Sequence, residues 1–456
     1  MFKLNPINFA LLICASTFSI SSFAGSDLQK MSDQELSDTT GQALMSLSYI
    51  APSDTANLET RRSGGNTNIG FYKLGLEAEV AINANIKKLQ LGCGGINGAN
   101  GCDIDIDNLS LSGMADTREG RVASDAVLTN PFLEFAIKNP TKASTREVVG
   151  LRVSAEKVLG LLTVGNNNDV PNGINSLSGY MVVNGYGNAV TKAGTFGLNP
   201  GETVYTTANI NIPFCFSGCG NDVPLLAGYG QGSSGSNTGI KIPSMVAPFV
   251  VSNSVVSGTR LTTANVSARA QIPDIPISTN SGQLGASLQQ PACIALVICL
   301  QDTFFKMNTT ISNLSANISF SEGLGYIHNL PINSPFYLGL QQQALQWPGA
   351  VETANKGWWL SMQDPINLGD ISPTNQVDIS SVYPQFAQIL GQKLQQPEYK
   401  ISVNLWDGLK ALIGSGITKD ITPINLSDSS VNINLNNLKL ATQNIVPNCY
   451  GGLKFC

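Results

Sequence analysis

The chain has 456 residues, a formal net charge of −5 and only 12% charged residues. This length suffices for a large core, which we expect to be divided between two β-rich domains. The low charge and the 45 glycines are unlike a cytosolic enzyme and typical of an extracellular β-protein with many tight turns. Because no basic block is present, the composition argues against nucleic acid as a partner.

Residues 1–24 have the pattern of a secretory signal peptide. Lys3 precedes the apolar run Phe9–Ile20, and Ser22 and Ala24 are the small residues expected before a cleavage site. The run is too short for a stable membrane anchor, and no later stretch reaches the length of a transmembrane helix. We therefore expect an exported protein of the outer membrane or cell surface, with the periplasm as its transit route or as an alternative location.

An N-terminal segment of the mature chain, residues 25–62, contains one short helix signal. Ser32 followed by Glu35 is a capping box, in which each side chain satisfies a backbone amide of the other residue. Gly41 is well placed to end the helix. We expect a short capped helix between these residues.

Residues 63–226 are predicted to form a first β domain. Apolar and polar residues alternate from Tyr72 to Ile86, a pattern that predicts one long, half-buried strand. A second strand-rich run extends from Arg146 to Gly165. Together these runs predict extended antiparallel sheet in the first half of the chain.

A Gly/Ser-rich loop at residues 227–240 is the best candidate for a domain boundary. Residues 241–456 then form a second β-rich domain, whose only clear helical pattern lies near residues 383–413. Trp406 falls in this helical stretch, and we expect it to pack the helix against the sheet.

A weak internal repeat suggests how the strands bend. In four segments the apolar period of two slips by one residue at a polar pair; these pairs are Lys87-Lys88, Asp107-Asn108, Ser312-Asn313 and Asn436-Asn437. A slip would turn all later side chains to the wrong face, and a β-bulge restores the face while bending the strand. The predicted fold is mainly β, with long, curved, bulged antiparallel sheets, sandwich-like or open-barrel-like, and few short helices.

Eight cysteines remain after signal cleavage, and they occur as close neighbours in the sequence. The candidate disulfide pairs are Cys93/Cys102, Cys215/Cys219, Cys293/Cys299 and Cys449/Cys456. Eight cysteines allow about 105 connectivities, so the sequence does not prove this pairing. Zinc is disfavoured because the spacings are not CxxC and the chain has one histidine. Disulfides fit an oxidising compartment outside the cytosol.

Three aspartates spaced by two, Asp103, Asp105 and Asp107, resemble ligands for a hard cation. An EF-hand loop starting at Asp103 would need glycine at Asn108 and glutamate at Met114, so that motif is rejected. On a strand the three carboxylates lie about 7 Å apart, too far to chelate one ion unaided. We interpret them as the solvated face of a strand; a calcium site completed by other loops is the alternative.

Catalytic signatures are weak throughout. The single histidine, His328, has no accompanying GxSxG elbow, and no phosphate loop or dinucleotide fingerprint occurs. The sequence therefore predicts no catalytic residue, no cofactor and no cofactor-binding residue, and we expect a protein that is not an enzyme.

Three of the four tryptophans, Trp347, Trp358 and Trp359, lie close together in the sequence. Exposed together, they could form a surface for a sugar or a protein partner. The alternative, which we favour, is that they fill the end of a sheet.

Several segments together resemble FilA-like pilus-assembly proteins of Gram-negative bacteria. They are SDQELSDTTGQ after the signal, NPFLEFAIKNP, EGLGYIHNLPINSPF and the ending NCYGGLKFC. The resemblance implies an exported surface protein that acts in pilus (fimbria) assembly or adhesion, with other pilus or surface proteins as partners and possible outer-membrane association. Two alternatives stay open: a carrier of an apolar ligand in the periplasm or outer membrane, and an outer-membrane β-barrel.

Overall fold

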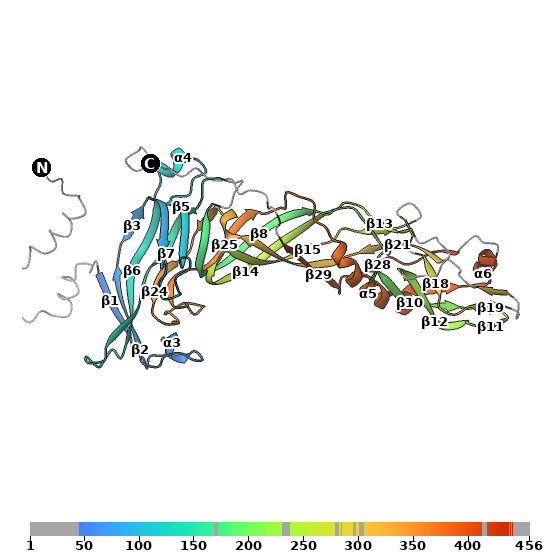
Figure 1. Ribbon diagram of the computed structural model, residues 1–456, viewed down its shortest axis with the longest axis horizontal. Coiled ribbons are helices and arrows are strands. Elements are labelled where there is room, and N and C mark those ends of the chain that lie inside the picture. Colours follow the sequence, from blue (N-terminus) through green and yellow to red (C-terminus); the bar gives the residue numbers. More distant parts are fainter. Residues whose placement is uncertain are drawn as a thin grey trace, which may run out of the picture. The chain divides into compact units, whose positions relative to one another are not determined.

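The computed structural model describes residues 45–167, 172–229, 238–278, 282–283, 285–294, 298–300, 305–412, 417–436, 438 and 440. The fold is mainly β, with several sheets, one of them curled like a half-barrel, and few short helices (Figure 1), which confirms the predicted fold class. The expected signal peptide and the expected helix between Ser32 and Gly41 lie outside the described residues.

The largest sheet contains fifteen strands within the described part of the chain. Its main path is β1-β2-β6-β7-β24-β25-β8-β14-β15-β22-β29, and β3, β4, β5 and β23 pair beside this path. The strands are β1 (Met45–Ile50), β2 (Ile69–Leu76), β3 (Glu79–Ile82), β4 (Ala84–Leu91), β5 (Ile104–Ser112), β6 (Ala126–Lys138), β7 (Glu147–Thr163), β8 (Ile174–Val190), β14 (Val246–Leu261), β15 (Thr263–Gln271), β22 (Ser315–Gly323), β23 (Asn329–Ile332), β24 (Phe336–Gln341), β25 (Gly357–Asp370) and β29 (Ser430–Asn436).

Smaller sheets and short helices complete the described fold. One sheet contains β10 (Thr203–Ile210), β12 (Gly220–Gly228), β16 (Ile275–Ile277), β18 (Ala286–Leu288), β21 (Phe305–Ser312), β26 (Ile401–Val403), β27 (Ile417–Asp420) and β28 (Ile424–Asn425). Two three-stranded sheets contain β11 (Cys215–Ser217), β19 (Ala292–Ile294) and β20 (Ile298–Leu300), and β9 (Gly194–Phe196), β13 (Gly239–Ile242) and β17 (Gly282–Gln283). The helices are α3 (Leu58–Arg61), α4 (Arg118–Val122), α5 (Tyr383–Leu394) and α6 (Leu405–Leu412), with 3₁₀ turns η1 (Leu324–Tyr326), η2 (Ser380–Val382) and η3 (Pro397–Tyr399).

The curl of the large sheet comes from β5, which bridges two strands of the main path. β5 pairs with β8 near Ile104 and with β7 near Ser110. Because β7 and β8 are three steps apart along the path, this double pairing bends β24 and β25 around into a half-barrel. Among the described residues, the apolar side chains inside this bend, such as Ile104, Val158 and Met362, belong to the larger of two buried clusters.

The expected domain boundary at residues 227–240 does not separate two compact units. Residues 45–456 cluster as one unit. The reason is long-range pairing across the segment: β8 pairs antiparallel with β14 from Val190↔Val246 to Leu177↔Leu261. The first and second halves of the chain therefore share one sheet. The expected helical stretch near residues 383–413 contains α5 and α6.

The strand expected from Tyr72 to Ile86 is broken into β2, β3 and the start of β4. β2 and β3 both pair with β6, and between them Asn130 of β6 has φ 48° and donates its backbone N–H to Ala78 O at 2.9 Å. Asn83 then ends β3, since its side chain donates to the carbonyls of the α4 region. Alternation of side chains continues across such corners, so it does not reveal them. In contrast, β7 spans the second expected run as one strand.

The predicted slip sites give a mixed result. Asn108 and Asn313 both have positive φ, 52° and 61°. However, the first two slip sites, Lys87-Lys88 and Asp107-Asn108, lie opposite each other on β4 and β5. The register of these strands does not shift there, so neither site is a bulge between them. Asn313 lies between β21 and β22, and Asn437 lies outside the described residues. Bulges do occur elsewhere: the register of β14 against β8 shifts between Val251 and Ser254.

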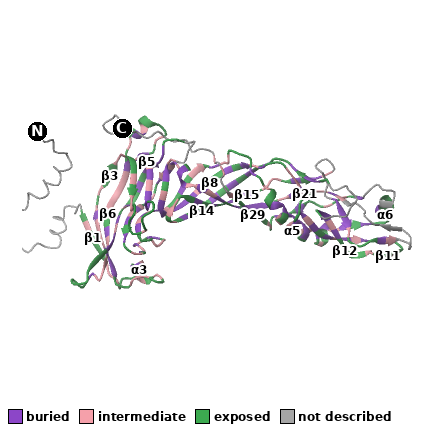
Figure 2. Cartoon of the chain, viewed as in Figure 1, coloured by how far each residue is buried: buried purple, intermediate pink, exposed green. Residues whose placement is uncertain are grey.

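Buried residues extend along the described strands (Figure 2), and the apolar ones among them form two clusters in the described part of the chain. The larger one runs along the strands from β5 to β29 and under α5, and every second residue of β15 is buried. A smaller cluster lies between β2, β6, β7, β24 and β25 and the connection that carries Trp347. This smaller cluster covers one face of the sheet near β1 and leaves the other face uncovered by it.

Candidate functional site

The aspartate trio does not form a common site. Asp103 is buried, and its carboxylate accepts hydrogen bonds from Arg260 Nε at 3.0 Å, Asn97 Nδ2 at 2.9 Å and Trp358 N at 3.0 Å. Asp105 points elsewhere and is paired with Lys88. Within the described residues, no group of three His, Cys, Asp or Glu side chains is placed to hold a metal ion. The calcium alternative is therefore not supported by the geometry.

Asp105 and Asp107 share two partners. Lys88 forms ion pairs with both carboxylates, at 2.5 and 2.9 Å, and Asn175 Nδ2 donates to both, at 3.0 and 2.7 Å. Partial burial raises the pKa of Asp105, but the hydrogen bonds from Lys88, Gln90 and Asn175 outweigh it and hold this pKa below its usual range. Basic and amide groups thus occupy the positions that a cation would take. The expectation of a solvated strand face is wrong for Asp103, which is buried and precedes β5, whereas Asp105 and Asp107 lie on β5 and are half-buried.

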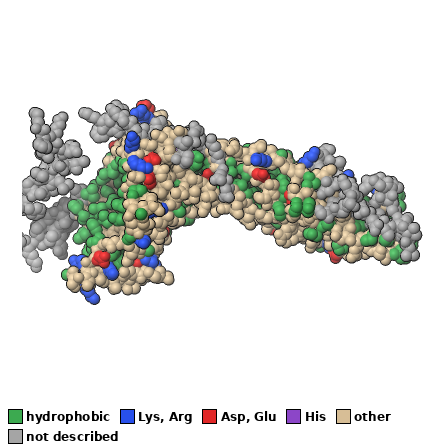
Figure 3. Space-filling model, viewed as in Figure 1, with side chains coloured by type: hydrophobic (Ala, Val, Ile, Leu, Met, Phe, Trp, Pro, Cys, Tyr) green, Lys and Arg blue, Asp and Glu red, His purple; other side chains and the backbone are tan. Residues whose placement is uncertain are grey.

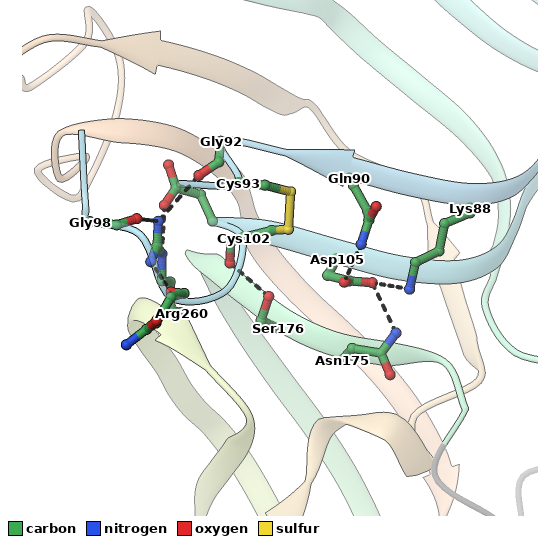
Figure 4. The surroundings of a disulfide bond; sticks show 12 residues. Lys88, Gln90, Gly92, Cys93, Gly98, Cys102, Asp105, Asn175, Ser176 and Arg260 are labelled. Atoms are coloured by element: carbon green, nitrogen blue, oxygen red, sulfur yellow. Dashed lines mark hydrogen bonds and ion pairs between the residues drawn. A yellow bond between two sulfur atoms is a disulfide. The ribbon is translucent and has the colours of Figure 1, made fainter. Parts of the chain in front are cut away.

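The loop behind the trio is fixed to the sheet at several points (Figure 4). Cys93 and Cys102 form a disulfide, and Cys102 O accepts a hydrogen bond from Ser176 Oγ at 2.8 Å. Arg260 donates to the carbonyls of Gly92 and Gly98, at 3.2 Å each. This arrangement satisfies the backbone of a tight loop and shows a structural role for the disulfide and for Arg260.

The other cysteine pairs have different outcomes. Cys215 and Cys219 form a disulfide, as expected. Cys293 is disulfide-bonded and lies opposite Cys299 in the register of β19 and β20. Cys449 and Cys456 lie outside the described residues.

The tryptophans do not form an exposed surface. Trp347 and Trp359 are 0% and 1% exposed and belong to the smaller core cluster, so the partner-surface interpretation is wrong for both. Trp358 is half-buried. Trp406, expected to pack α6 onto the sheet, is 72% exposed, because α6 turns its opposite side inward.

His328 lies inside the sheet beside Val164. It is buried, and its Nδ1 lies 2.9 Å from Val164 O. Burial lowers its pKa, against the hydrogen bond, so the ring is neutral at physiological pH. Glu322 is also buried, and burial raises its pKa to about 7 although a backbone hydrogen bond with Leu438 lowers it. Burial alone explains both shifts.

The most unusual surface of the described chain is an apolar sheet face. Six neighbouring strands, β1, β2, β6, β7, β24 and β25, carry rows of apolar side chains on the same side. Two rows follow directly from the register: Tyr49, Tyr72, Phe135, Leu151, Leu340 and Trp358, and then Leu47, Leu74, Leu133, Val153, Leu338 and Leu360. Alternation along the strands adds a third row of Met45, Leu76, Pro131, Ala155, Phe336 and Met362. We call these residues the apolar face.

The apolar face is open toward β1 and closed toward β25. Leu47 is 74% exposed, and Leu133 and Val153 are 39% and 47% exposed, whereas Ala155 and Met362 are buried in the half-barrel. Figure 3 shows hydrophobic side chains gathered over the strands near β1. At ordinary strand and residue spacing, three rows across six strands cover roughly 500–600 Å². This is at the upper end of the apolar patches that monomeric proteins expose.

Tyr49 and Tyr72 show that the open part of the face is ordered. Their rings stack with centroids 4.3 Å apart. Gly70 makes room for this stack, since a Cβ at that position would lie 2.9 Å from the Tyr49 ring. A substitution at Gly70 would therefore displace an aromatic side chain from the apolar face.

The opposite face of the same strands is covered. There, Glu134 and Arg152 form a buried ion pair, and Arg152 also donates to Pro348 O at 2.8 Å. The Arg152 guanidinium lies over the Trp347 ring, 5.3 Å from its centroid. The segment that carries Trp347 packs on this opposite side of the sheet. It therefore does not cover the apolar face.

The strand β1 is the edge of this sheet, since the main path of described strands begins with it. Its sequence MSLSYI contains no charged residue and no proline. Natural proteins usually protect an exposed edge strand with a lysine, a proline or a bulge. The edge next to the most exposed part of the apolar face thus lacks the usual protection against strand pairing.

Sequence reasoning missed the apolar face, although a signal for it exists. The segment from Phe132 to Ile137 has apolar residues at both odd and even positions. Such a strand is apolar on both sides and normally lies inside a protein. The apolar face was not recognised, because the sequence does not show whether another segment packs on each side of these strands.

Within the described residues, no helix is both long and apolar enough to cross a membrane. The chain matches no known family model, no curated protein and no solved structure.

Proposed function

We propose that the protein is an exported, non-enzymatic surface protein that acts in pilus assembly or adhesion by binding other pilus or surface proteins. The observation that carries this proposal is the apolar face beside the unprotected edge of β1. Burying roughly 500 Å² of apolar surface is worth about 12 kcal/mol before the costs of association. A stable partner contact is the use that fits such a surface best.

The edge of β1 offers a partner on the apolar face one further contact, strand addition. An extended partner segment can form hydrogen bonds with the free edge of β1 and direct alternate apolar side chains onto the continuation of the three rows. Met45, Leu47 and Tyr49 already show the required alternation, because Ser46 and Ser48 point to the other side. The partner segment would therefore carry apolar residues at every second position.

Replacing Leu47 with lysine tests this proposal in the producing bacterium. A charge in the open part of the face must be desolvated on binding, so we expect surface filaments or adhesion to fall to the level of the gene deletion. Ser319→Lys is the matched control, since Ser319 is exposed on β22 outside the apolar face. If the Leu47→Lys strain, with normal amounts of exported protein, forms filaments and adheres like the control, the proposal is wrong.

The carrier alternative gains little support from the hollows of the described residues. Two open hollows of about 530 and 590 Å³ are lined mainly by polar residues. An apolar cavity of about 40 Å³ lies under α5, lined by residues that include Ile242, Ile275 and Phe386. It has room for about three water-sized groups, far less than an acyl chain needs. We therefore keep the surface-binding function as the proposal.

A further inference from the structure

Helix α6 turns its apolar side outward. Leu405, Trp406 and Leu409 are 41%, 72% and 43% exposed, while Asp407 is buried. Asp407 accepts a hydrogen bond from Asn404 N at 2.9 Å and forms an ion pair with Lys419. An isolated surface helix packs its apolar side on the core. The reversed orientation of α6 is held by the polar contacts of Asp407 and leaves three large apolar side chains in solvent.

A second pair of exposed aromatic side chains belongs to the segment PFCFSGC. Phe214 is 82% and Phe216 63% exposed; the Cys215–Cys219 disulfide closes the turn that contains Phe216, and Phe214 directly precedes it. Phe214 also has φ 61°, a conformation that a bulky residue adopts only when the surroundings impose it. The segment thus holds two aromatic rings outward at an energetic cost.

These two features are neighbours in the fold. β10 and β26 pair in parallel, with Ile210 opposite Val403, so the chain reaches Phe214 and α6 from adjacent strands. Asn211 N also donates to Val403 O at 2.9 Å. α6 contacts β20, which pairs through β19 with β11, and Figure 1 draws α6, β19 and β11 together. We call Phe214, Phe216, Leu405, Trp406 and Leu409 the aromatic tip.

We propose that the aromatic tip of one copy docks on the apolar face of a second copy, so that the chains assemble head to tail. This inference rests on the proposed function, in which the apolar face is a docking surface, and it names a second copy of the same chain as the occupant. The contact is heterologous, because two different surfaces of the chain meet. Such contacts generate open filaments unless the rotation between copies closes a ring.

The areas of the two surfaces match. Three aromatic side chains, each exposed by more than half, and two half-exposed leucines present roughly 500–600 Å². The apolar face presents about the same area at ordinary strand spacing. Together they bury about 1,000–1,200 Å², which reaches the range of specific interfaces.

The chemistry of both surfaces also favours this pairing. The five residues of the aromatic tip and the residues of the apolar face carry no charge, so their contact buries no unpaired charge. The exposed Lys410, one helical turn from Trp406, has a side chain long enough to keep its charge in solvent. Exposed phenylalanine and tryptophan side chains are typical anchors of protein interfaces. Each copy contributes one tip and one face, which gives the one-to-one ratio that a chain of identical copies requires.

A mixing experiment with two variants of the full exported chain tests the inference. The face variant carries Leu47→Lys, and the tip variant carries Trp406→Ser together with Phe216→Ser. Light scattering after size exclusion should show wild-type protein growing in mass with concentration and each variant alone as a monomer. Truncating such anchors weakens association by at least about 30-fold. Mixed one to one, the variants should form a dimer, because one intact tip meets one intact face.

The controls distinguish this inference from other outcomes. Tyr186→Ser removes a side chain that is 55% exposed and lies outside both surfaces, and it should assemble like wild type. Circular dichroism and thiol titration show whether each variant is folded and oxidised. Monomeric wild-type protein at millimolar concentration, or folded variants that do not pair when mixed, would overturn the inference. If Leu47→Lys still abolishes adhesion in that case, the proposed function stands and the occupant of the face is another protein.

Discussion

Arg152→Met lowers the free energy of unfolding by about 3–5 kcal/mol at neutral pH. Arg152 and Glu134 are paired at 2.5 Å, with side chains that are only 7% and 2% exposed. Removing the arginine leaves a buried carboxylate without its cation, and it also removes the hydrogen bond to Pro348 O. Urea unfolding followed by tryptophan fluorescence measures the change.

The pH dependence identifies the cause of this loss. Burial raises the pKa of Glu134, whereas Arg152 lowers it. A carboxyl whose pKa is higher in the folded chain than in the unfolded chain loses stability as the pH rises between the two values. Without Arg152 the folded pKa rises further, so the penalty grows as the pH rises above the unfolded pKa of the carboxyl and shrinks as the pH falls back toward it.

The double variant Arg152→Met/Glu134→Gln is the matched control for the ion pair. It removes both charges, so it should recover most of the stability that Arg152→Met loses at pH 7.5. An equal loss in the single and double variants at every pH would show that Arg152 acts through packing on the aromatic rings and not through its charge.

Trp347→Ala also destabilises the fold by about 3–5 kcal/mol. Trp347 is fully buried, packs against the Phe71 ring with centroids 5.6 Å apart, and lies so close to Gly150 that a Cβ there would be 3.0 Å from its ring. Its removal opens a cavity in the smaller core, which covers the side of the sheet opposite the apolar face. Denaturant unfolding with calorimetry measures the effect.

Trp406→Ala is the control for Trp347→Ala, because it removes the same side chain from an exposed position. Trp406 is 72% exposed, so the free energy of unfolding should change by less than about 0.5 kcal/mol. Similar losses for both tryptophan variants would contradict the described burial of the chain. A loss of stability for Trp347→Ala alone would agree with Trp347 in the core and Trp406 in the aromatic tip.

Local features of the fold were predictable from the sequence. The strand-rich run from Arg146 to Gly165 corresponds to β7, and the helical pattern near residues 383–413 contains α5 and α6. Two close cysteine pairs form disulfides, because a short turn, Gly-rich between Cys93 and Cys102, already brings their Cα atoms together. These signals are local, so tertiary contacts do not alter them.

Long-range features were not predictable. No local pattern shows that β8 pairs with β14 across residues 227–240 or that β25 runs parallel to β8. The Gly/Ser-rich composition of residues 227–240 is equally consistent with a linker and with a loop between paired strands. The two-domain expectation therefore failed where one sheet joins both halves.

The candidate site was predictable only in part. Alternation identified one apolar side of Tyr72, Leu74 and Leu76, and a buried side was the natural interpretation. Whether a strand face is covered depends on which distant segment packs on it, and Trp347 covers the other side. Exposure of an apolar face is thus a property of the whole fold and not of any strand.

A photo-reactive amino acid at position 47, placed in the chain within the producing cells, tests the central claim most directly. The apolar face is proposed to be covered by a partner, so irradiation should join position 47 to another polypeptide, identified by mass spectrometry. The same group at position 319 should give little product, because Ser319 lies outside the face. Equal yields at both positions, or only intramolecular products at position 47 of a folded and exported chain, would contradict the account.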